Sequence, residues 1–339
     1  MRTVVVVTTG GTIASASDAS GAKVASVSGT ALLAGLDAPA GVAVRVVEAM
    51  NRNSYDIDLA HMDLLWRTVV DALADVDTCG VVVTHGTDTL EESAMLVDLL
   101  HDDARPVVFT GAQLSHDDPA TDGPRNLADA IAVAASANAR GLGVLVCFAG
   151  VLHAARGTRK VHNSARSAFF DADHGPLGMV VDGCVRVHTQ LTRPATGLGA
   201  GLALAGTRVD IVAVYPGADA TALEAHLARG AHGIVLQATG YGNANARIVA
   251  AVGDAGVPVV LSSRVAAGEI RPVYGGGGGG VDLVAAGAIP AGHLRPSQAR
   301  ILLAAMLAAG RDAEQIAAAF ADAPVRFVEA PETVTPARA

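Results

Sequence analysis

The stretch Val4-Val5-Val6-Val7-Thr8-Thr9-Gly10-Gly11-Thr12 stands near the beginning of the chain and indicates its fold class. Four consecutive valines predict a strand, and the strand-helix order of the segments after it indicates a parallel sheet covered by helices on both faces. Two glycines and a threonine follow this strand directly. Ligands of open α/β sheets bind beyond the carboxyl ends of the strands, and glycine lets the backbone approach a ligand closely. The loop that ends at Thr12 is therefore a candidate binding site.

The glycine pattern of this loop excludes the common phosphate-binding loops. A dinucleotide site requires G-x-G-x-x-G and a P-loop requires G-x-x-x-x-G-K-[ST], and the loop matches neither pattern. Thr12 remains as the group with the potential to react. A plain tight turn with capping threonines is the alternative interpretation of the same residues.

Another predicted strand, Gly80–Thr84, ends in a similar way, with Gly86, Thr87 and Asp88 after it. Thr87 or Asp88 is expected to cap a helix that runs to about Leu100, and the N-terminus of a helix stabilises negative charge. Two loops that each present Gly-Thr can converge on one small ligand. A role for Asp88 as an N-cap is the alternative, and it is compatible with ligand binding.

Predicted strands and helices alternate along most of the chain. The strands are Thr3–Thr8, Val42–Val47, Gly80–Thr84, Pro106–Thr110, Leu142–Phe148, Val209–Tyr215, Gly233–Gln237 and Val257–Leu261. Segments with helical spacing of apolar residues separate these strands. Residues 192–206 are rich in Gly, Ala, Pro and Thr and show no periodic pattern of apolar residues, which is typical of a linker. We therefore predict an α/β protein: a larger parallel-sheet domain over 1–191, a linker over 192–208 and a smaller flavodoxin-like α/β domain over 209–339.

Three local signals refine this outline. Asp182-Gly183 predicts a hairpin within Met179–His188. Six consecutive glycines over Gly275–Gly280 predict a flexible loop. Ser297 and Asp312 are expected to cap two C-terminal helices.

Composition excludes several classes of partner. The 339 residues carry 24 basic and 33 acidic side chains, a net charge of −9, and only 3% aromatic residues. Nucleic-acid binding favours basic patches and stacking rings, so we expect no nucleic acid. The longest uncharged apolar stretch, Gly141–Leu152, is shorter than the roughly 20 residues of a membrane span, so we expect no membrane association. The basic residues are 22 Arg and only two Lys, Lys23 and Lys160.

Histidine and cysteine form no recognisable metal or redox motif. Cys79, Cys147 and Cys184 are far apart and odd in number, which argues against a disulfide framework. They are interpreted as small buried residues in a reduced, cytoplasmic protein, and the opening sequence lacks the pattern of a secretory signal. His85 is interpreted as structural rather than as a ligand or base. We expect neither a metal nor a cofactor.

Two segments together resemble the signatures of the bacterial-type L-asparaginases, the asparaginase/glutaminase family. They are TTGGTIAS at Thr8–Ser15 and VVVTHGTDTLEESA at Val81–Ala94. The resemblance covers most of the chain through shorter motifs: Thr110-Gly111-Ala112, Asp122-Gly123-Pro124, Arg159-Lys160-Val161, Gly240-Tyr241-Gly242-Asn243, Ser262-Ser263-Arg264-Val265 and Pro296-Ser297-Gln298-Ala299-Arg300. It implies an amidohydrolase that converts L-asparagine to L-aspartate and ammonia.

The resemblance also implies catalytic roles. Thr12 matches the nucleophile that forms an acyl-enzyme ester with the substrate. Thr87 matches a second threonine, paired with Lys160 and Asp88. A threonine hydroxyl is a weak nucleophile, so an ammonium group and a carboxylate that polarise it or a water would be needed.

Substrate-binding roles follow from the same resemblance. Backbone N–H groups of the loops at Gly11 and Gly86 would form an oxyanion hole, and the carbonyl of Ala112 would hold the leaving amide nitrogen. Asp88 would also bind the substrate's α-ammonium group. Asn243 matches a residue that reaches the site of a neighbouring subunit, which implies a homo-oligomer, usually a tetramer built as a dimer of dimers.

The chain departs from the family pattern in three places. The lid segment Ser15–Gly29 lacks the usual tyrosine, and Ala25 lies close to its expected position. Tyr274 falls near a glutamate of the family that contacts the substrate amine, and it could serve either role. The Ser-Gln pair that binds the substrate's α-carboxylate aligns with Asp56-Ile57. Because two like charges ~4 Å apart cost about 4 kcal/mol at an effective dielectric of 20, either Ser54 takes this role, Asp56 turns away, or the substrate differs.

Three other functions stay open at this stage. A glutaminase or a related small-amide hydrolase would use the same residues. A subunit that supplies ammonia to a transamidation complex usually has an extra N-terminal domain, whereas this sequence starts at the first strand. A non-catalytic amino-acid sensor is the third alternative, but a sensor has no need of Thr12, Thr87, Asp88 and Lys160 together.

Overall fold

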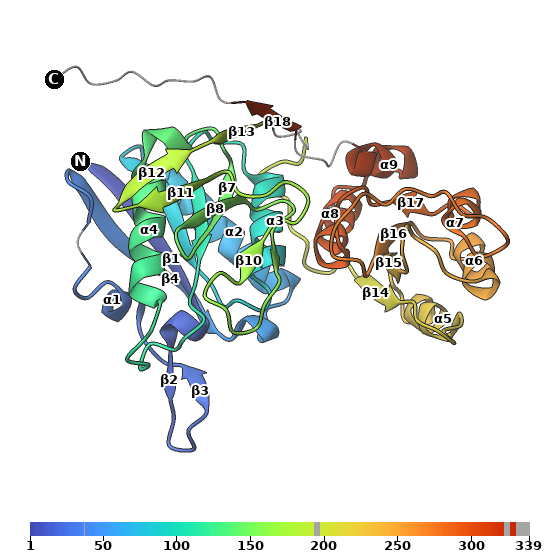
Figure 1. The fold of residues 1–339 in the computed structure, drawn as a ribbon, viewed down its shortest axis with the longest axis horizontal. Helices are drawn as coiled ribbons and strands as arrows, with labels where there is room; N and C mark the ends of the chain where they lie inside the picture. Colours follow the sequence, from blue (N-terminus) through green and yellow to red (C-terminus); the bar gives the residue numbers. More distant parts are fainter. Residues whose placement is uncertain (37, 193–196, 322–325, 330–339) are drawn as a thin grey trace.

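The computed structural model describes residues 1–36, 38–192, 197–321 and 326–329, which form two α/β domains (Figure 1). The larger domain is built on an eight-stranded sheet of order β12-β11-β8-β7-β6-β5-β1-β4. Its strands are β1 Arg2–Gly10, β4 Val42–Arg52, β5 Thr78–Thr84, β6 Val107–Thr110, β7 Val144–Phe148, β8 Val151–Ala154, β11 Gly178–Val181 and β12 Cys184–Val187. The predicted two-domain α/β class is confirmed.

The larger sheet is mixed rather than wholly parallel. The strands β4, β1, β5, β6 and β7 are parallel, whereas β8, β11 and β12 extend the sheet in antiparallel fashion. The change occurs at Ala149 and Gly150, both with positive φ (51° and 75°), which turn the chain straight back after β7. The hairpin predicted at Asp182-Gly183 is confirmed between β11 and β12.

The valines of β1 divide between the two faces of the sheet. Val5 and Val7 belong to one core cluster, with helices α2 (Leu59–Ala74) and α3 (Leu90–Leu100). Val4 and Val6 belong to the opposite cluster, with α1 (Gly29–Leu32) and α4 (Gly123–Ala135). All four valines are completely buried. The continuous apolar run thus reflects a strand with helices on both faces.

The smaller domain carries the parallel sheet β14-β15-β16-β17. Its strands are β14 Val209–Ala213, β15 Gly233–Ala238, β16 Val259–Ser263 and β17 Ile289–Pro290, and its helices are α5 Thr221–Ala228, α6 Ala246–Gly253, α7 Gly280–Ala285, α8 Pro296–Ala308 and α9 Ala313–Ala321. Helix α8 faces the larger domain (Figure 1), and its buried residues join the core cluster of α2 and α3. The two domains therefore share one apolar interface.

Short elements complete the chain. They are the 3-10 turns η1 Thr12–Ala14, η2 Ser54–Asp56 and η3 Ala137–Ala139, and the strands β2 Ser15–Ser17, β3 Lys23–Ala25, β9 Arg159–Lys160, β10 Phe169–Phe170, β13 Thr189–Thr192 and β18 Arg326–Glu329. Strands β2 and β3 form a hairpin that projects from the larger domain (Figure 1).

The described part of the predicted linker is anchored rather than loose. The buried carboxylate of Asp63 accepts hydrogen bonds from the N–H groups of Leu204 and Ala205, and the indole of Trp66 donates to the carbonyl of Ala200. Residues 193–196 of the predicted linker lie outside the described residues. The exact boundaries 1–191, 192–208 and 209–339 stay a prediction.

Two predicted caps are wrong and one is confirmed. Helix α3 begins at Leu90 after Thr89, not at Thr87 or Asp88. Helix α8 has Arg295 at its N-cap. The hydroxyl of Ser297 instead contacts the other domain, as described below. Asp312 does cap the last helix, because its carboxylate accepts a hydrogen bond from the N–H of Gln315.

Two further local predictions differ from the structure. Within the glycine run, the backbone of Gly278 and Gly279 packs so closely on Asn245 and Tyr274 that a side chain there would clash. Close packing, rather than loop flexibility, accounts for glycine at these two positions. Of the three cysteines, only Cys147 is fully buried, while Cys184 is exposed.

Candidate active site

Four neighbouring strands, β4, β1, β5 and β6, end at the same edge of the larger sheet and deliver their loops to one corner. Gly11, with a φ of 78°, lies directly against the backbone of Gly86, and a Cβ at either position would overlap its neighbours. Gly111 packs in the same manner against the carbonyl of His85. Glycine is therefore required for the loops to touch. The threonines next in sequence, Thr12 and Thr87, belong to the same corner.

A lysine from a distant strand completes this corner. The Nζ of Lys160, in β9, donates hydrogen bonds to the Oγ1 of Thr87 at 2.8 Å and to the Oδ1 of Asp88 at 2.7 Å. The Lys160 side chain is 16% exposed and that of Asp88 is 54% exposed. A positive charge thus lies against a hydroxyl while a carboxylate at the rim balances it.

The 3-10 turn η2 settles how Ser54 and Asp56 are arranged. Ser54 is buried beside Gly86, its Oγ accepts a hydrogen bond from the N–H of Asp88 at 3.2 Å, and its carbonyl accepts one from Thr89. Asp56 instead pairs with Arg52 at 2.5 Å, and its side chain is 62% exposed. The structure therefore brings Ser54 into the corner and turns the carboxylate of Asp56 toward a cation.

The loop after β6 is held by buried polar side chains. Asp122 accepts hydrogen bonds from the N–H groups of Gln113 and Leu114, and Asn126 donates to the carbonyl of Gly111. Ala112 lies between these anchors and is completely buried. Its carbonyl is thus part of a loop whose backbone is fixed.

His85 is a structural residue in this arrangement. Its ring is completely buried, lies against Phe109, and bonds the carbonyl of Gly86 through Nδ1 at 2.8 Å. Burial lowers the pKa of His85 to about 4, so the imidazole is neutral at pH 7. A neutral side chain that packs behind the loop supports its shape and is not positioned as a base for solvent or ligand.

The β2–β3 hairpin follows Thr12 directly and is fastened to the loop after β6. Lys23 donates to both carboxylate oxygens of Asp117, at 2.7 and 3.0 Å, and Ser17 donates to the same carboxylate through its N–H and its hydroxyl. The Lys23 ammonium, with hydroxyls of Ser115 and Ser17, holds the pKa of Asp117 well below its usual range. We call the Lys23–Asp117 pair the latch of this hairpin.

Asn243 and Tyr274 belong to the smaller domain, between β15 and α7. The Oδ1 of Asn243 accepts a hydrogen bond from the N–H of Gly280, and the Tyr274 side chain is exposed. Across the described residues, no hydrogen bond or ion pair joins either side chain to Lys160 or Thr87. Within one chain, these two predicted binding residues are not brought to the site.

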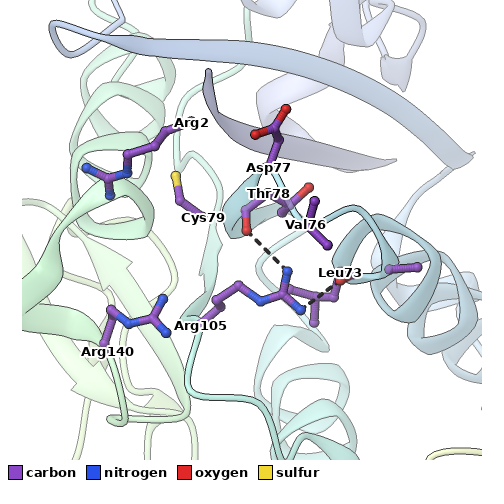
Figure 2. Close-up of a pocket in the computed structure, with 9 residues that line it drawn as sticks. Arg2, Leu73, Val76, Asp77, Thr78, Cys79, Arg105 and Arg140 are labelled. Carbon is purple, nitrogen blue, oxygen red and sulfur yellow. Dashed lines mark hydrogen bonds between the residues drawn. The ribbon is translucent and has the colours of Figure 1, made fainter.

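Two of the cavities lie at opposite ends of the parallel strands of the larger sheet. One, of about 370 Å³, opens beside the corner and is lined by Asp88, Glu91, Lys160, Val161, His162 and Asn163. The other, of about 480 Å³, lies near the amino ends of β1 and β5 and is lined by three arginines among other residues (Figure 2). There Arg105 donates to Asp103 and to the carbonyls of Leu73, Asp75 and Thr78. Acceptors of the protein itself therefore already engage Arg105 in the second cavity. The first cavity is the candidate site, because Asp88 and Lys160 line it.

Sequence reasoning weighed Ser54 only as an alternative and did not consider Glu91 as a site residue. Neither residue stands out from its neighbours in the sequence, because a serine after a strand and a glutamate in the first turn of a helix are common. A signal for Ser54 did exist, because it follows a strand whose carboxyl end meets the same sheet edge. Glu91 has no such signal, because its partners Lys160 and Ser297 are distant in sequence.

Comparisons with known proteins agree with the fold and with the motifs. The family model "Asparaginase, N-terminal" matches residues 3–193, and "Glutaminase/Asparaginase C-terminal domain" matches residues 208–320. The L-asparaginase of Bacillus licheniformis is 34% identical, over 80% of this chain and 85% of that protein. A probable L-asparaginase of Deinococcus radiodurans is 37% identical, over 92% and 95%.

The solved structures include a similar fold. The crystal structure of a probable cytoplasmic L-asparaginase from Campylobacter jejuni superposes with a TM-score of 0.83 at 28% identity, covering 95% of this chain and 99% of that chain. Of the helices in the described residues, none combines the length and the hydropathy that a membrane-spanning segment requires.

Proposed function

Because the chain belongs to the asparaginase/glutaminase family of amidohydrolases, we propose that it hydrolyses the side-chain amide of L-asparagine to L-aspartate and ammonia. The observation that carries the proposal is the contact of Lys160 Nζ with the Thr87 hydroxyl at 2.8 Å and with Asp88 at 2.7 Å. An ammonium group next to a hydroxyl and a carboxylate supplies the polarisation that a threonine or a water needs in order to attack an amide.

The proposed reaction proceeds through an ester on Thr12. The Thr12 hydroxyl attacks the amide carbon, the C–N bond breaks, and the nitrogen leaves as ammonia after receiving a proton. Water then cleaves the ester, which releases aspartate and restores the hydroxyl. Thr87, with Lys160 and Asp88, polarises the attacking oxygen. Backbone N–H groups at Gly11 and Gly86 stabilise the oxyanion, and losing one such donor typically costs about 2.7–4 kcal/mol.

Substrate recognition in this proposal relies on Ser54 and Asp88. The buried hydroxyl of Ser54 lies beside Gly86, whereas the Asp56 carboxylate pairs with Arg52. Ser54 therefore suits the substrate's α-carboxylate, and the half-exposed Asp88 suits its α-ammonium group. The Arg52–Asp56 pair supports asparagine as the substrate, because a paired Asp56 carboxylate repels the substrate's α-carboxylate less than an unpaired one would.

The proposal includes assembly of several copies of the chain. Asn243 and Tyr274 belong to the smaller domain, and among the described residues no hydrogen bond joins either side chain to Lys160 or Thr87, which favours a role for them in the site of a neighbouring copy. A homotetramer built from two dimers fits the family, and a cytoplasmic location stays a prediction.

A screen of ammonia release tests the proposed function. The substrates are L-asparagine, D-asparagine, L-glutamine and small aliphatic amides, with aspartate measured in parallel. Stoichiometric ammonia and aspartate from L-asparagine is the expected result. Preference for L-glutamine would make the protein a glutaminase. Saturable asparagine binding by calorimetry without ammonia would contradict the proposal.

A further inference from the structure

Two side chains of the smaller domain reach across to the segment that carries Lys160. The first turn of α8 presents Ser297 and Gln298 to the larger domain. The Oγ of Ser297 donates to the Oε1 of Glu91 at 2.5 Å, and the Oε2 of Glu91 accepts the N–H of Lys160 at 2.7 Å. One carboxylate thus joins the backbone of the lysine to the other domain.

Gln298 holds the chain just before Lys160. Its Oε1 accepts the N–H of Gly157 at 2.8 Å, and its Nε2 donates to the carbonyls of Ala155 and Thr158 at 2.8 and 3.1 Å. The Gln298 side chain is almost completely buried, at 1% exposure. The same Nε2 also donates to the carbonyl of Glu91 at 3.3 Å. A buried amide that bonds four backbone groups fixes their relative positions, because each group would otherwise lose a hydrogen bond away from water.

The strand that carries Lys160 has little support of its own. Strand β9 is two residues long and pairs only with the two-residue strand β10. Such a short ladder cannot by itself hold a side chain within the fraction of an ångström that catalysis demands. The bonds from Glu91 and Gln298 supply the support that the ladder lacks.

We propose that Glu91 is a positioning residue: Ser297 at the start of α8 holds the Glu91 carboxylate, and this carboxylate holds the backbone of Lys160 so that the ammonium reaches Thr87. The inference rests on the proposed function for its kinetic readout. Glu91 touches the Lys160 backbone and Ser297, whereas Lys160 itself touches Thr87.

The test compares Ser297→Ala with Ser262→Ala. Ser262 is a matched control, because its buried hydroxyl bonds the carbonyl of Leu294 within the smaller domain. Ser297→Ala is expected to lower kcat for asparagine about tenfold, with KM changed less than about twofold, because small misplacements of a catalytic group reduce turnover more than binding. Ser297→Thr keeps the hydroxyl and should restore kcat, and Ser262→Ala should leave both constants near the wild-type values.

A double-mutant cycle examines the route through Glu91. If Ser297 acts through the Glu91 carboxylate, removing Ser297 from a Glu91→Ala background should change kcat no further. A further tenfold loss in Glu91→Ala/Ser297→Ala would show independent effects and would overturn the proposed route.

Lysine labelling provides a readout that does not need activity. The chain has only two lysines, so brief acetylation with acetic anhydride and mass spectrometry give the ratio of Lys160 to Lys23 labelling. Ser297→Ala and Glu91→Ala should raise this ratio, while Ser262→Ala should not. An unchanged ratio together with an unchanged kcat would overturn the proposal. If the wild type releases no ammonia from asparagine, the proposed function fails, and the labelling ratio still decides the role of Glu91.

Discussion

The ammonium nitrogen of Lys160 lies 2.8 Å from the hydroxyl oxygen of Thr87, although the two residues are 73 positions apart in sequence. The same nitrogen lies 2.7 Å from Asp88. The chain has 22 Arg and two Lys, and a compositional bias toward arginine is the simplest explanation for the scarcity of lysine. The geometry gives a reason for lysine at this one position, since a compact ammonium can contact both partners.

Replacing Lys160 with arginine should abolish most of the activity although the charge is kept. The guanidinium is a broad planar fork that is effectively never deprotonated, so it cannot reproduce the contact with Thr87. We expect Lys160→Arg to lower kcat for asparagine by about 100-fold or more. Ammonia release measures the rate, and circular dichroism checks that the variant is folded. Full activity would remove Lys160 from the mechanism.

Removing the hydroxyl of Thr12 should have the largest effect of any single change. We expect Thr12→Ala to reduce turnover by at least about 1,000-fold, as for other hydroxyl nucleophiles. Thr68→Ala is the control, because Thr68 is half-buried on α2 and its hydroxyl bonds the carbonyl of Leu64 within the same helix. Near-normal turnover in Thr12→Ala would show that the nucleophile lies elsewhere.

Ser54 and Asp56 should differ in their effect on substrate binding. A hydrogen bond to a charged group is worth about 1.5–3 kcal/mol, so Ser54→Ala should raise KM for asparagine about tenfold or more. Asp56→Asn should change KM little, because the Asp56 carboxylate is 62% exposed and pairs with Arg52. Steady-state kinetics of both variants measure the difference. The reverse order of effects would place the substrate's carboxylate at Asp56.

The latch between Lys23 and Asp117 should control how often the β2–β3 hairpin opens. Asp117→Asn removes the charge that Lys23 contacts at 2.7 Å, so trypsin should cleave after Lys23 several-fold faster. Asp102→Asn changes an exposed aspartate elsewhere and is the control. Equal cleavage rates in the two variants would show that the latch does not hold the hairpin.

The latch should not respond to pH near neutrality, because the pKa of Asp117 is lowered in the folded protein. A carboxylate whose pKa is depressed in the folded protein contributes stability at every pH above its ordinary value near 3.8, and loses it only as the pH falls further. Between pH 5 and 8, the cleavage rate corrected for trypsin activity should therefore stay constant.

Glu92 should make the protein less stable as the pH rises toward neutrality. Burial, with a smaller effect from Glu91, raises the pKa of Glu92 to about 7, and its Oε2 has no hydrogen-bond partner among the described residues. Folding raises the pKa of this carboxyl group, so the group contributes to the free energy of unfolding while it is protonated. The folded protein loses this stability as the pH rises from about 4.5 through 7.

The variant Glu92→Gln should remove this dependence. At pH 8 it should be more stable than the wild type by about 3 kcal/mol, and at pH 5 by less than about 1 kcal/mol, because folding raises the pKa from 4.5 to about 7 and one pKa unit corresponds to about 1.4 kcal/mol. Urea unfolding at both pH values measures the change, with Glu314→Gln on the exposed face of α9 as control. A pH-independent difference would show that Glu92 does not titrate as described.

The sequence predicted the features that depend on neighbouring residues. A run of valines gave the buried strand β1, and glycine after it and after β5 indicated loops that approach a ligand. The two-domain α/β class followed from the alternation of strand-like and helix-like segments. Helix caps were less reliable, as Ser297 shows, because a serine at a helix start can bond a distant carboxylate instead of its own helix.

By itself, then, the amino-acid sequence determined which chemistry is available: two threonines after glycines, an aspartate beside one of them, and a single lysine in a motif. Only the tertiary structure decided which groups meet. Strand order brought Ser54 to Gly86 and turned Asp56 away, and domain docking placed Ser297 on Glu91. The physical reason is that periodicity and turn chemistry act over a few residues. The partner of a buried polar group is chosen instead by the packing of whole strands and helices, over separations such as the 206 positions between Glu91 and Ser297.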